Sequence, residues 1–206
     1  MTKAQEMLYK VGVENLFIAF MTGTDKADSI PTYDEEIYSL PAIESLGIAG
    51  NPTSAAKWAS NKKIVNVTKN NQYTLTLDHP GLPVEVLDKM LGKKPIKGIA
   101  FDDAKMKELP YFAVGFIAPL SSGEFQARWY PRCQVTPPEE THTTNNDETS
   151  LPTEQLVMTA SPLLYNDITK ADFNSARDSA AGISKEDFMQ QVVCDESQIE
   201  TLFPTP

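Results

Sequence analysis

Histidine and cysteine are scarce in this chain, which has two of each among its 206 residues. His79 lies between Asp78 and Pro80, and His142 lies in a polar segment. Neither belongs to an HExxH motif or has a cysteine nearby. A structural or catalytic zinc site needs three or four such ligands at characteristic spacings. The sequence therefore predicts no zinc site, and we interpret His79 as a turn residue.

Motifs of catalysis and phosphate binding are also absent. The chain has no GxSxG nucleophile elbow, no GxGxxG or GxxxxGK[ST] loop and no EF-hand spacing. Asp102 and Asp103, with Glu108, resemble paired carboxylates, but they lead into Ala-Lys-Met-Lys-Glu, which is typical of a surface loop. We therefore expect no enzyme activity, no bound cofactor and no metal.

The two cysteines are far apart and form no CxxC pattern. Cys133 falls on the apolar face of a predicted strand, which favours a buried free thiol. A disulfide between Cys133 and Cys194 would need an oxidising compartment, and nothing in the sequence indicates one.

Signals for export or membrane insertion are missing as well. The first ten residues lack the apolar core and cleavage site of a signal peptide. No run of about 18 apolar residues is present, so no transmembrane helix is expected. These features predict a protein made and folded in the cytoplasm.

Basic residues are outnumbered, with 18 Lys and Arg against 28 Asp and Glu and a net charge of −10. Nucleic-acid-binding proteins usually carry a basic stripe that neutralises phosphates. This chain has only short basic pairs, Lys62 with Lys63 and Lys93 with Lys94. We therefore expect no specific binding of DNA or RNA.

What the sequence does contain is a series of β-strand patterns. Seven candidate strands cover residues 11–20, 42–48, 73–77, 96–102, 110–117, 123–135 and 153–162. Residues 73–77 alternate with period two, with Tyr73, Leu75 and Leu77 on the inner face. A chain of this length typically forms one domain with appendages. The predicted fold class is mostly β, with a minor helical part (α+β).

Residues 125–135 show the longest alternation. We expect Phe125, Ala127, Trp129, Cys133 and Val135 on one face, and polar residues on the other, as in a half-buried antiparallel strand. Pro131 interrupts the apolar register and removes a ladder donor, so a bulge or a sheet edge is expected there.

One helix is predicted between Pro83 and Gly92. Proline suits the first turn of a helix and glycine the position just after its end. Val84, Leu87 and Leu91, joined by Val86 and Met90, form an apolar stripe at helical spacing, which indicates packing against the core.

Long polar loops are expected at residues 22–41, 47–71 and 137–152. A loop as long as 47–71 is unusual inside a compact domain, and such loops are often functional or interfacial. A short strand at residues 64–67 is an alternative for part of it.

We divide the chain into an N-terminal arm (1–10), a β domain (11–165) and an acidic C-terminal extension (166–206) that is partly helical. The extension contains helical patterns at residues 175–181 and 184–193. Ser184 precedes the second as an N-cap, with Asp187 in the place where a capping box usually has Glu.

Several segments, in their order and spacing, resemble the major tail proteins that build the tail tube of long, flexible-tailed phages of Gram-positive bacteria. These segments are Val-Gly-Val-Glu-Asn-Leu (11–16), Leu-Pro-Val-Glu-Val-Leu-Asp-Lys-Met-Leu-Gly (82–92), Pro-Tyr-Phe-Ala-Val-Gly-Phe (110–116), Trp-Tyr-Pro-Arg-Cys (129–133), Pro-Pro-Glu-Glu (137–140) and Leu-Val-Met-Thr-Ala-Ser-Pro (156–162). The resemblance covers about residues 11–165 and is weakest at 21–70 and beyond 165.

The resemblance implies an antiparallel β-sandwich or partly closed barrel with one flanking helix, long loops and a C-terminal arm. Such subunits form hexameric rings that stack into a tube through which the double-stranded genome passes without specific binding. It also implies a virion protein of the tail, assembled in the host cytoplasm. Its partners would be further copies of itself, a tape-measure protein and tail-end proteins, with no membrane.

A tube needs contacts between subunits, and we expect them from residues 1–10, residues 47–71 and the acidic extension. Trp58 is the first candidate for a ring-to-ring contact, because Trp is enriched at interface hot spots. Ile64 and Val65 complete the expected subunit interface. The alternative for Trp58 is packing on its own domain.

A second hypothesis is a monomeric β-sandwich module that binds a ligand such as a carbohydrate, with Trp129 and Tyr130 as an exposed platform. The position of Trp129 on the apolar face of its strand favours a core role instead.

Overall fold

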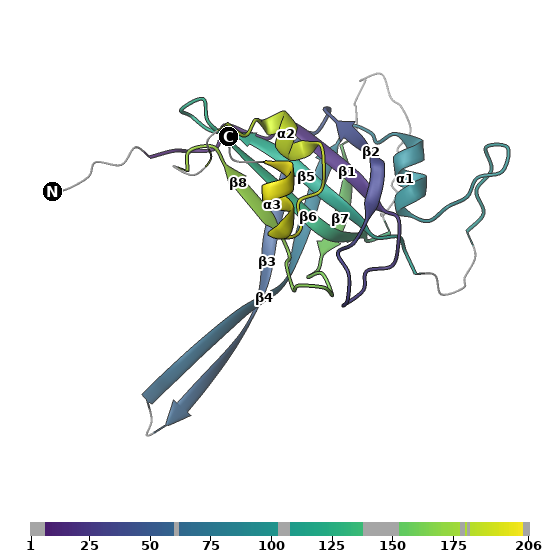
Figure 1. Cartoon of the computed structure of the whole chain (residues 1–206). Coiled ribbons are helices and arrows are strands. Elements are labelled where there is room, and N and C mark those ends of the chain that lie inside the picture. The colour runs from purple at the N-terminus through teal and green to yellow at the C-terminus, as the bar shows by residue number, and fades with distance from the viewer. Residues whose placement is uncertain are drawn as a thin grey trace, which may run out of the picture.

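The computed structural model describes residues 7–59, 62–102, 108–137, 153–177, 180 and 182–203. Figure 1 shows a compact β-rich body from which a long hairpin projects. The strands are β1 (Asn15–Met21), β2 (Tyr33–Leu40), β3 (Ser45–Ala59), β4 (Lys62–His79), β5 (Phe112–Pro119), β6 (Phe125–Val135), β7 (Glu154–Ala160) and β8 (Ala171–Asn174). The helices are α1 (Val84–Met90), α2 (Lys185–Met189) and α3 (Ser197–Leu202).

These strands form one antiparallel sheet in the order β2-β1-β5-β6-β7-β4-β3, and β8 pairs with β6 beside this path. The mostly β class with short helices beside an antiparallel sheet is confirmed. The sheet is open, because the described parts of β2 and β3 lie at its two ends and do not pair with each other.

Curling of the sheet creates the larger of two apolar clusters. It joins buried side chains of β1, β4 and β7, such as Ile18, Leu75 and Met158, to Val86 and Met90 of α1. Strands from both ends of the sheet therefore share one core, and α1 packs against it. Each fully buried side chain of this size contributes about 1.5–3 kcal/mol, so hydrophobic burial maintains the curl.

The second cluster lies on the other face of β5 and β6, where the C-terminal segment packs. Ala113, Ile117 and Trp129 meet Phe188 and Met189 of α2 in this cluster. The indole Nε1 of Trp129 donates a hydrogen bond of 3.1 Å to the backbone oxygen of Phe188. Over its described residues, the acidic extension thus packs on the sheet of its own chain.

A bulge in β6 decides which of its side chains join which cluster. Val114 of β5 pairs with Tyr130, whereas Phe112, two residues earlier, pairs with Cys133, three residues later. The bulge expected at Pro131 is confirmed. The extra residue reverses the alternation, so Trp129 and Cys133 lie in different clusters. The prediction that Trp129 and Cys133 share one face of the strand was wrong, because a bulge shifts the side-chain register by one residue.

Helix α1 follows the sequence prediction closely. Pro83 is its N-cap residue, and Gly92 follows its end with a φ of 64°, a left-handed conformation that glycine adopts without strain. Leu87 and Leu91 pack against the larger cluster. Val84 does not, since it is 74% exposed, so its assignment to the apolar stripe was wrong.

Three predictions of local structure were wrong. Residues 22–41 contain the edge strand β2, the described residues of 47–71 belong to β3 and β4, and residues 96–102 contain a turn rather than a strand. The alternative of a strand at residues 64–67 is confirmed, since these residues lie within β4. Strands β2 and β3 are rich in residues with low β propensity. Pairing with a neighbouring strand, which local sequence does not reveal, imposes their extended conformation.

The helices of the C-terminal segment are shorter than predicted. Of the pattern at 184–193, only Lys185–Met189 is helical, and Ser184 with Asp187 forms a reciprocal capping box. The pattern at 175–181 falls partly on residues outside the described ones, and residues 175–177 make a turn. No residue beyond 137 in the predicted loop up to 152 is described.

A buried ion pair fixes two loops to the bulge of β6. The Asp25 carboxylate, whose side chain is 1% exposed, lies 3.1 Å from Nε of Arg132. The same carboxylate accepts a hydrogen bond from the backbone N–H of Leu164 at 2.9 Å. The Tyr33 hydroxyl donates to the backbone oxygen of Pro131 at 2.7 Å. Breaking such a pair would leave an uncompensated buried charge.

Both cysteines are buried free thiols, as expected for Cys133. Burial raises the pKa of the Cys133 thiol, and it raises the pKa of Cys194 to about 12. The thiolate is the reactive form, so both are unreactive at neutral pH while the chain is folded.

Gly115 tests the contact between the sheet and the C-terminal segment. A Cβ atom at Gly115 would lie 2.5 Å from Cε of Met189 and 2.7 Å from the Trp129 ring. We expect Gly115→Ala to lower the free energy of unfolding by about 1–3 kcal/mol through overpacking. The measurement is urea denaturation followed by circular dichroism.

The matched control is Gly47→Ala on β3, where the nearest atoms to an added Cβ are 3.6 Å away on Thr76. This change should leave stability the same or slightly raise it, because alanine restricts the unfolded chain. Equal effects of the two substitutions would contradict the tight packing at Gly115.

Candidate assembly surfaces

The projecting hairpin of β3 and β4 is the most prominent surface feature of the molecule (Figure 1). At its base, β4 pairs with β7 over Tyr73–His79. On the N-terminal side of Tyr73, toward the tip of the hairpin, β4 pairs only with β3 among the described residues. The outer half of the hairpin therefore has unpaired backbone groups on both outer edges.

Polar side chains and a bulge support this hairpin. Asn51 donates to Thr74 Oγ1 at 3.1 Å, and Asn71 donates to Thr53 Oγ1 at 3.0 Å. The register of the two strands shifts between Gly50 and Pro52. Proline is tolerated there because β3 is an edge strand and a bulge needs no ladder donor.

The three residues expected at the subunit interface all lie in the outer half of this hairpin. The backbone register pairs Trp58 with Lys63 and Lys57 with Val65, and Ile64 lies between these pairs. The structure thus brings Trp58, Ile64 and Val65 near one tip by strand pairing. Their side chains lie outside the described part of the structure.

The opposite edge of the sheet is β2. Asp34, Glu35 and Glu36 form an acidic run on this strand, and Glu35 and Glu36 are exposed. Charged edge strands discourage nonspecific pairing. The open sheet therefore offers one charged edge at β2 and one extended edge at β3.

The N-terminal segment lies along the end of β5. Val11 donates to the backbone oxygen of Pro119 at 2.9 Å, and Ser121 donates to that of Tyr9 at 3.0 Å. Met7 and Tyr9 remain 89% and 69% exposed. Residues 1–6 of the predicted arm lie outside the described residues.

The described residues bring together no obvious catalytic or metal-binding group. None of their His, Cys, Asp and Glu side chains form a group of three or more that could hold a metal ion. His79 ends β4 and is 3% exposed, so it is a buried strand residue rather than a turn residue. His142 and Asp103 lie outside the described part of the chain.

Trp129 and Tyr130 do not form an exposed platform. Each is 0% exposed, and they point into the two different clusters on either side of the sheet. The sequence predicted a half-buried strand at residues 125–135. This prediction was wrong, because the side chains of β6 alternate between two clusters and are buried on both faces of the sheet.

Comparisons with known proteins give no family for this chain. None of the protein-family models matches it, and no curated protein matches it significantly in sequence. Within the described residues, no helix is both long enough and apolar enough to cross a membrane. Arguments about function therefore depend on the chain's own surfaces.

His79 at the base of the hairpin gives a pH-dependent prediction. Burial lowers its pKa from 6.5, while the carboxylates of Glu154, Asp78 and Glu44 oppose this shift. Its Nδ1 atom has no hydrogen-bond partner among the described residues. The folded chain therefore prefers neutral His79, and the unfolded chain binds the proton more readily below pH about 6.5.

We expect stability to fall between pH 7.5 and 5, and to fall less in His79→Gln, which cannot titrate. Urea denaturation at several pH values measures this difference. Hydrogen bonds from Ser45 and Gln155 lower the pKa of Asp78 from 3.8. The titration of Asp78 therefore changes stability at a pH lower than the interval from 7.5 to 5. The same pH dependence in both proteins would contradict the prediction.

Proposed function

We propose that this chain is a structural subunit of a phage tail tube, of the type found in long, flexible-tailed phages. The observation that carries the proposal is the hairpin of β3 and β4, which leaves the body of the molecule with unpaired edges. The resemblance of residues 11–165 to major tail proteins supports the same function. In this proposal the chain is not an enzyme.

Exposed strand edges are a liability in a monomer and a means of assembly in an oligomer. The outer part of β3, from Asn51 to Ala59, spans about 30 Å at the rise of an extended strand. A projection of this length can reach a neighbouring subunit. Trp58, Ile64 and Val65 lie on it and would contact that neighbour, within one ring or in the next ring of the stack.

The charge of the chain suits a conduit for DNA. With a net charge of −10, the tube would repel phosphates rather than hold them, whereas Lys and Arg contacts would retain the genome. The proposed partners are copies of the same chain in stacked, hexameric rings, with a tape-measure protein inside and tail-end proteins at the ends. The proposed location is the virion tail, after assembly in the host cytoplasm.

The alternative of a monomeric carbohydrate-binding module has lost its main support, because Trp129 and Tyr130 are buried. The two functions differ in assembly state. A tube subunit forms rings, whereas a module remains monomeric and binds a small ligand.

Electron microscopy of the purified full chain across a concentration series tests the proposal. We expect hollow tubes or six-fold rings. A truncated variant, in which Asn-Gly replaces residues 51–72 and joins Gly50 to Tyr73, should fold but form no tubes. Asn-Gly suits a type I′ turn between paired strands. Gly50 and Tyr73, which the turn would connect, are already paired across the hairpin.

Trp58→Ala is a milder variant in the same series and should shorten or abolish the tubes. Circular dichroism and thermal melting check that both variants remain folded. Tubes of normal length from the truncated variant would contradict the role of the hairpin. Binding of an oligosaccharide by a strictly monomeric chain would favour the alternative function.

A further inference from the structure

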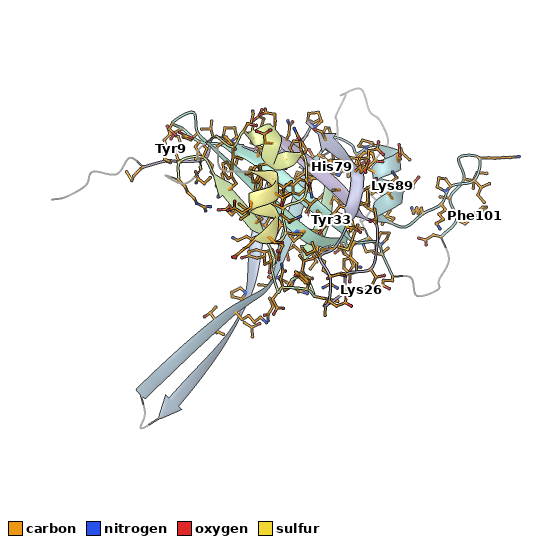
Figure 2. All side chains as sticks on the ribbon, in the orientation of Figure 1. Tyr9, Lys26, Tyr33, His79, Lys89 and Phe101 are labelled. Atoms are coloured by element: carbon orange, nitrogen blue, oxygen red, sulfur yellow. The ribbon has the colours of Figure 1, made fainter. Side chains whose placement is uncertain are left out.

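A second projecting segment, separate from the hairpin, exposes large apolar side chains. It covers residues 92–102, between α1 and β5, and Figure 2 shows Phe101 far from the body of the molecule. Ile96, Ile99 and Phe101 are 70%, 58% and 79% exposed. We call residues 92–102 the apolar loop. Exposed apolar groups gathered in one place usually mark an interaction site.

A tight turn gives the apolar loop a defined shape. The backbone N–H groups of Ile96 and Ile99 each donate to the other residue's oxygen, at 2.9 and 3.1 Å. Between them, Lys97 and Gly98 both have positive φ angles, 52° and 81°, as in a type I′ turn. The two isoleucines are therefore held side by side before binding, which reduces the entropy cost of association.

A pocket that could receive such side chains lies between β8 and α3. Its volume is about 360 Å³. Its apolar lining includes Ile168, Phe173, Ile183, Phe188, Ile199 and Phe203. The rings of Phe173 and Phe188 stack at 5.4 Å, and those of Phe188 and Phe203 at 6.4 Å. We call this the aromatic pocket.

The charges around the apolar loop and the aromatic pocket are opposite. The apolar loop carries three lysines, Lys93, Lys94 and Lys97, and one acidic residue, Asp102, which gives it a net charge of +2. No ion pair holds these lysines within the described residues. Asp195 and Glu196 line the pocket, and Glu200 follows on α3. Hydrogen bonds from Ser197 and Asn166 lower the pKa of Asp195.

The basic residues that line the pocket reduce this charge without cancelling it. Arg177 pairs with Asp172 at 2.9 Å, and Lys170 keeps its charge over the ring of Tyr73. Two basic and three acidic residues line the pocket, which leaves it a net charge of −1. Glu196 and Glu200 are exposed and have no ion-pair partner in the described part of the chain. The apolar floor of the pocket therefore has an exposed acidic rim.

The loop and the pocket cannot meet within one molecule. Figure 1 shows β8 and α3 on one side of the body and the loop beyond α1 on the other. We propose that the apolar loop of one copy inserts Ile96, Ile99 and Phe101 into the aromatic pocket of a second copy, with its lysines against the acidic rim. The partner is thus another copy of this chain, in a head-to-tail contact.

A head-to-tail contact uses two different surfaces of each subunit, so it closes into a ring or continues as a filament. The inference deepens the proposed function and rests on it, because it names a subunit contact separate from the hairpin. It also predicts salt sensitivity, since exposed charge pairs are screened at high ionic strength.

Disulfide trapping in the full chain tests this contact directly. One variant carries Phe101→Cys and another Ile199→Cys, at positions that are 79% and 46% exposed. Both native cysteines are buried, so the introduced thiols react selectively. The control replaces the second variant by Val84→Cys, which is 74% exposed but lies on α1. Mass spectrometry measures cross-linked dimers in equimolar mixtures under mild oxidation.

We expect the Phe101→Cys and Ile199→Cys mixture to give at least about tenfold more cross-linked dimer than the control, corresponding to about 1.4 kcal/mol of preference. Equal yields in the two mixtures would overturn the proposal. This readout needs no tubes, so it separates the contact from the proposed function. Cross-linking without tubes would reject the proposed function but keep the contact. Tubes without cross-linking would reject the contact but keep the proposed function.

Charge reversal provides an independent test. Lys93→Glu with Lys94→Glu, and separately Glu196→Lys with Glu200→Lys, should each weaken self-association about tenfold or more, measured by sedimentation velocity. All four substitutions in one chain should restore it. The four residues lie on the surface, and thermal melting checks the fold. Failure of the combined variant to recover association would overturn the charge pairing that the proposal requires.

Discussion

Burial of β5 and β6 on both faces is the constraint on which the rest of the structure depends. The sheet curls so that its two ends and α1 enclose one face, and the C-terminal segment covers the other. Gly115 permits the close approach of Met189 and Trp129, and the bulge at Pro131 places Trp129 and Cys133 in opposite clusters. Neither face of this central pair remains available for a ligand.

This arrangement leaves the surfaces for interaction at the periphery. The two sheet edges, the hairpin of β3 and β4, the apolar loop and the aromatic pocket all surround a core that is closed on both faces. A subunit with several separate contact surfaces and a rigid centre suits a repetitive assembly. The hairpin lies between β2 and α1 in the chain and the apolar loop between α1 and β5, so these two surfaces come from separate segments.

The sequence predicted the central elements well because their patterns are local. The period-two alternation at residues 73–77, the Pro and Gly that flank α1, and the bulge at Pro131 all depend on neighbouring residues. It failed for β2 and for the outer hairpin, where pairing with another strand imposes an extended chain on a sequence of low β propensity. Trp58, Ile64 and Val65 were chosen for their apolar character, and only the register placed them together near one tip.

By itself, the sequence determined the β-rich class, the free cysteine at Cys133, the single helix in the middle of the chain and the acidity. These follow from composition and from short-range patterns. Only the tertiary structure decided that the acidic C-terminal segment covers the chain's own sheet, and that Phe173, Phe188 and Phe203 line one pocket. Such contacts join residues far apart in sequence, and no local pattern specifies which distant surface an apolar face will cover.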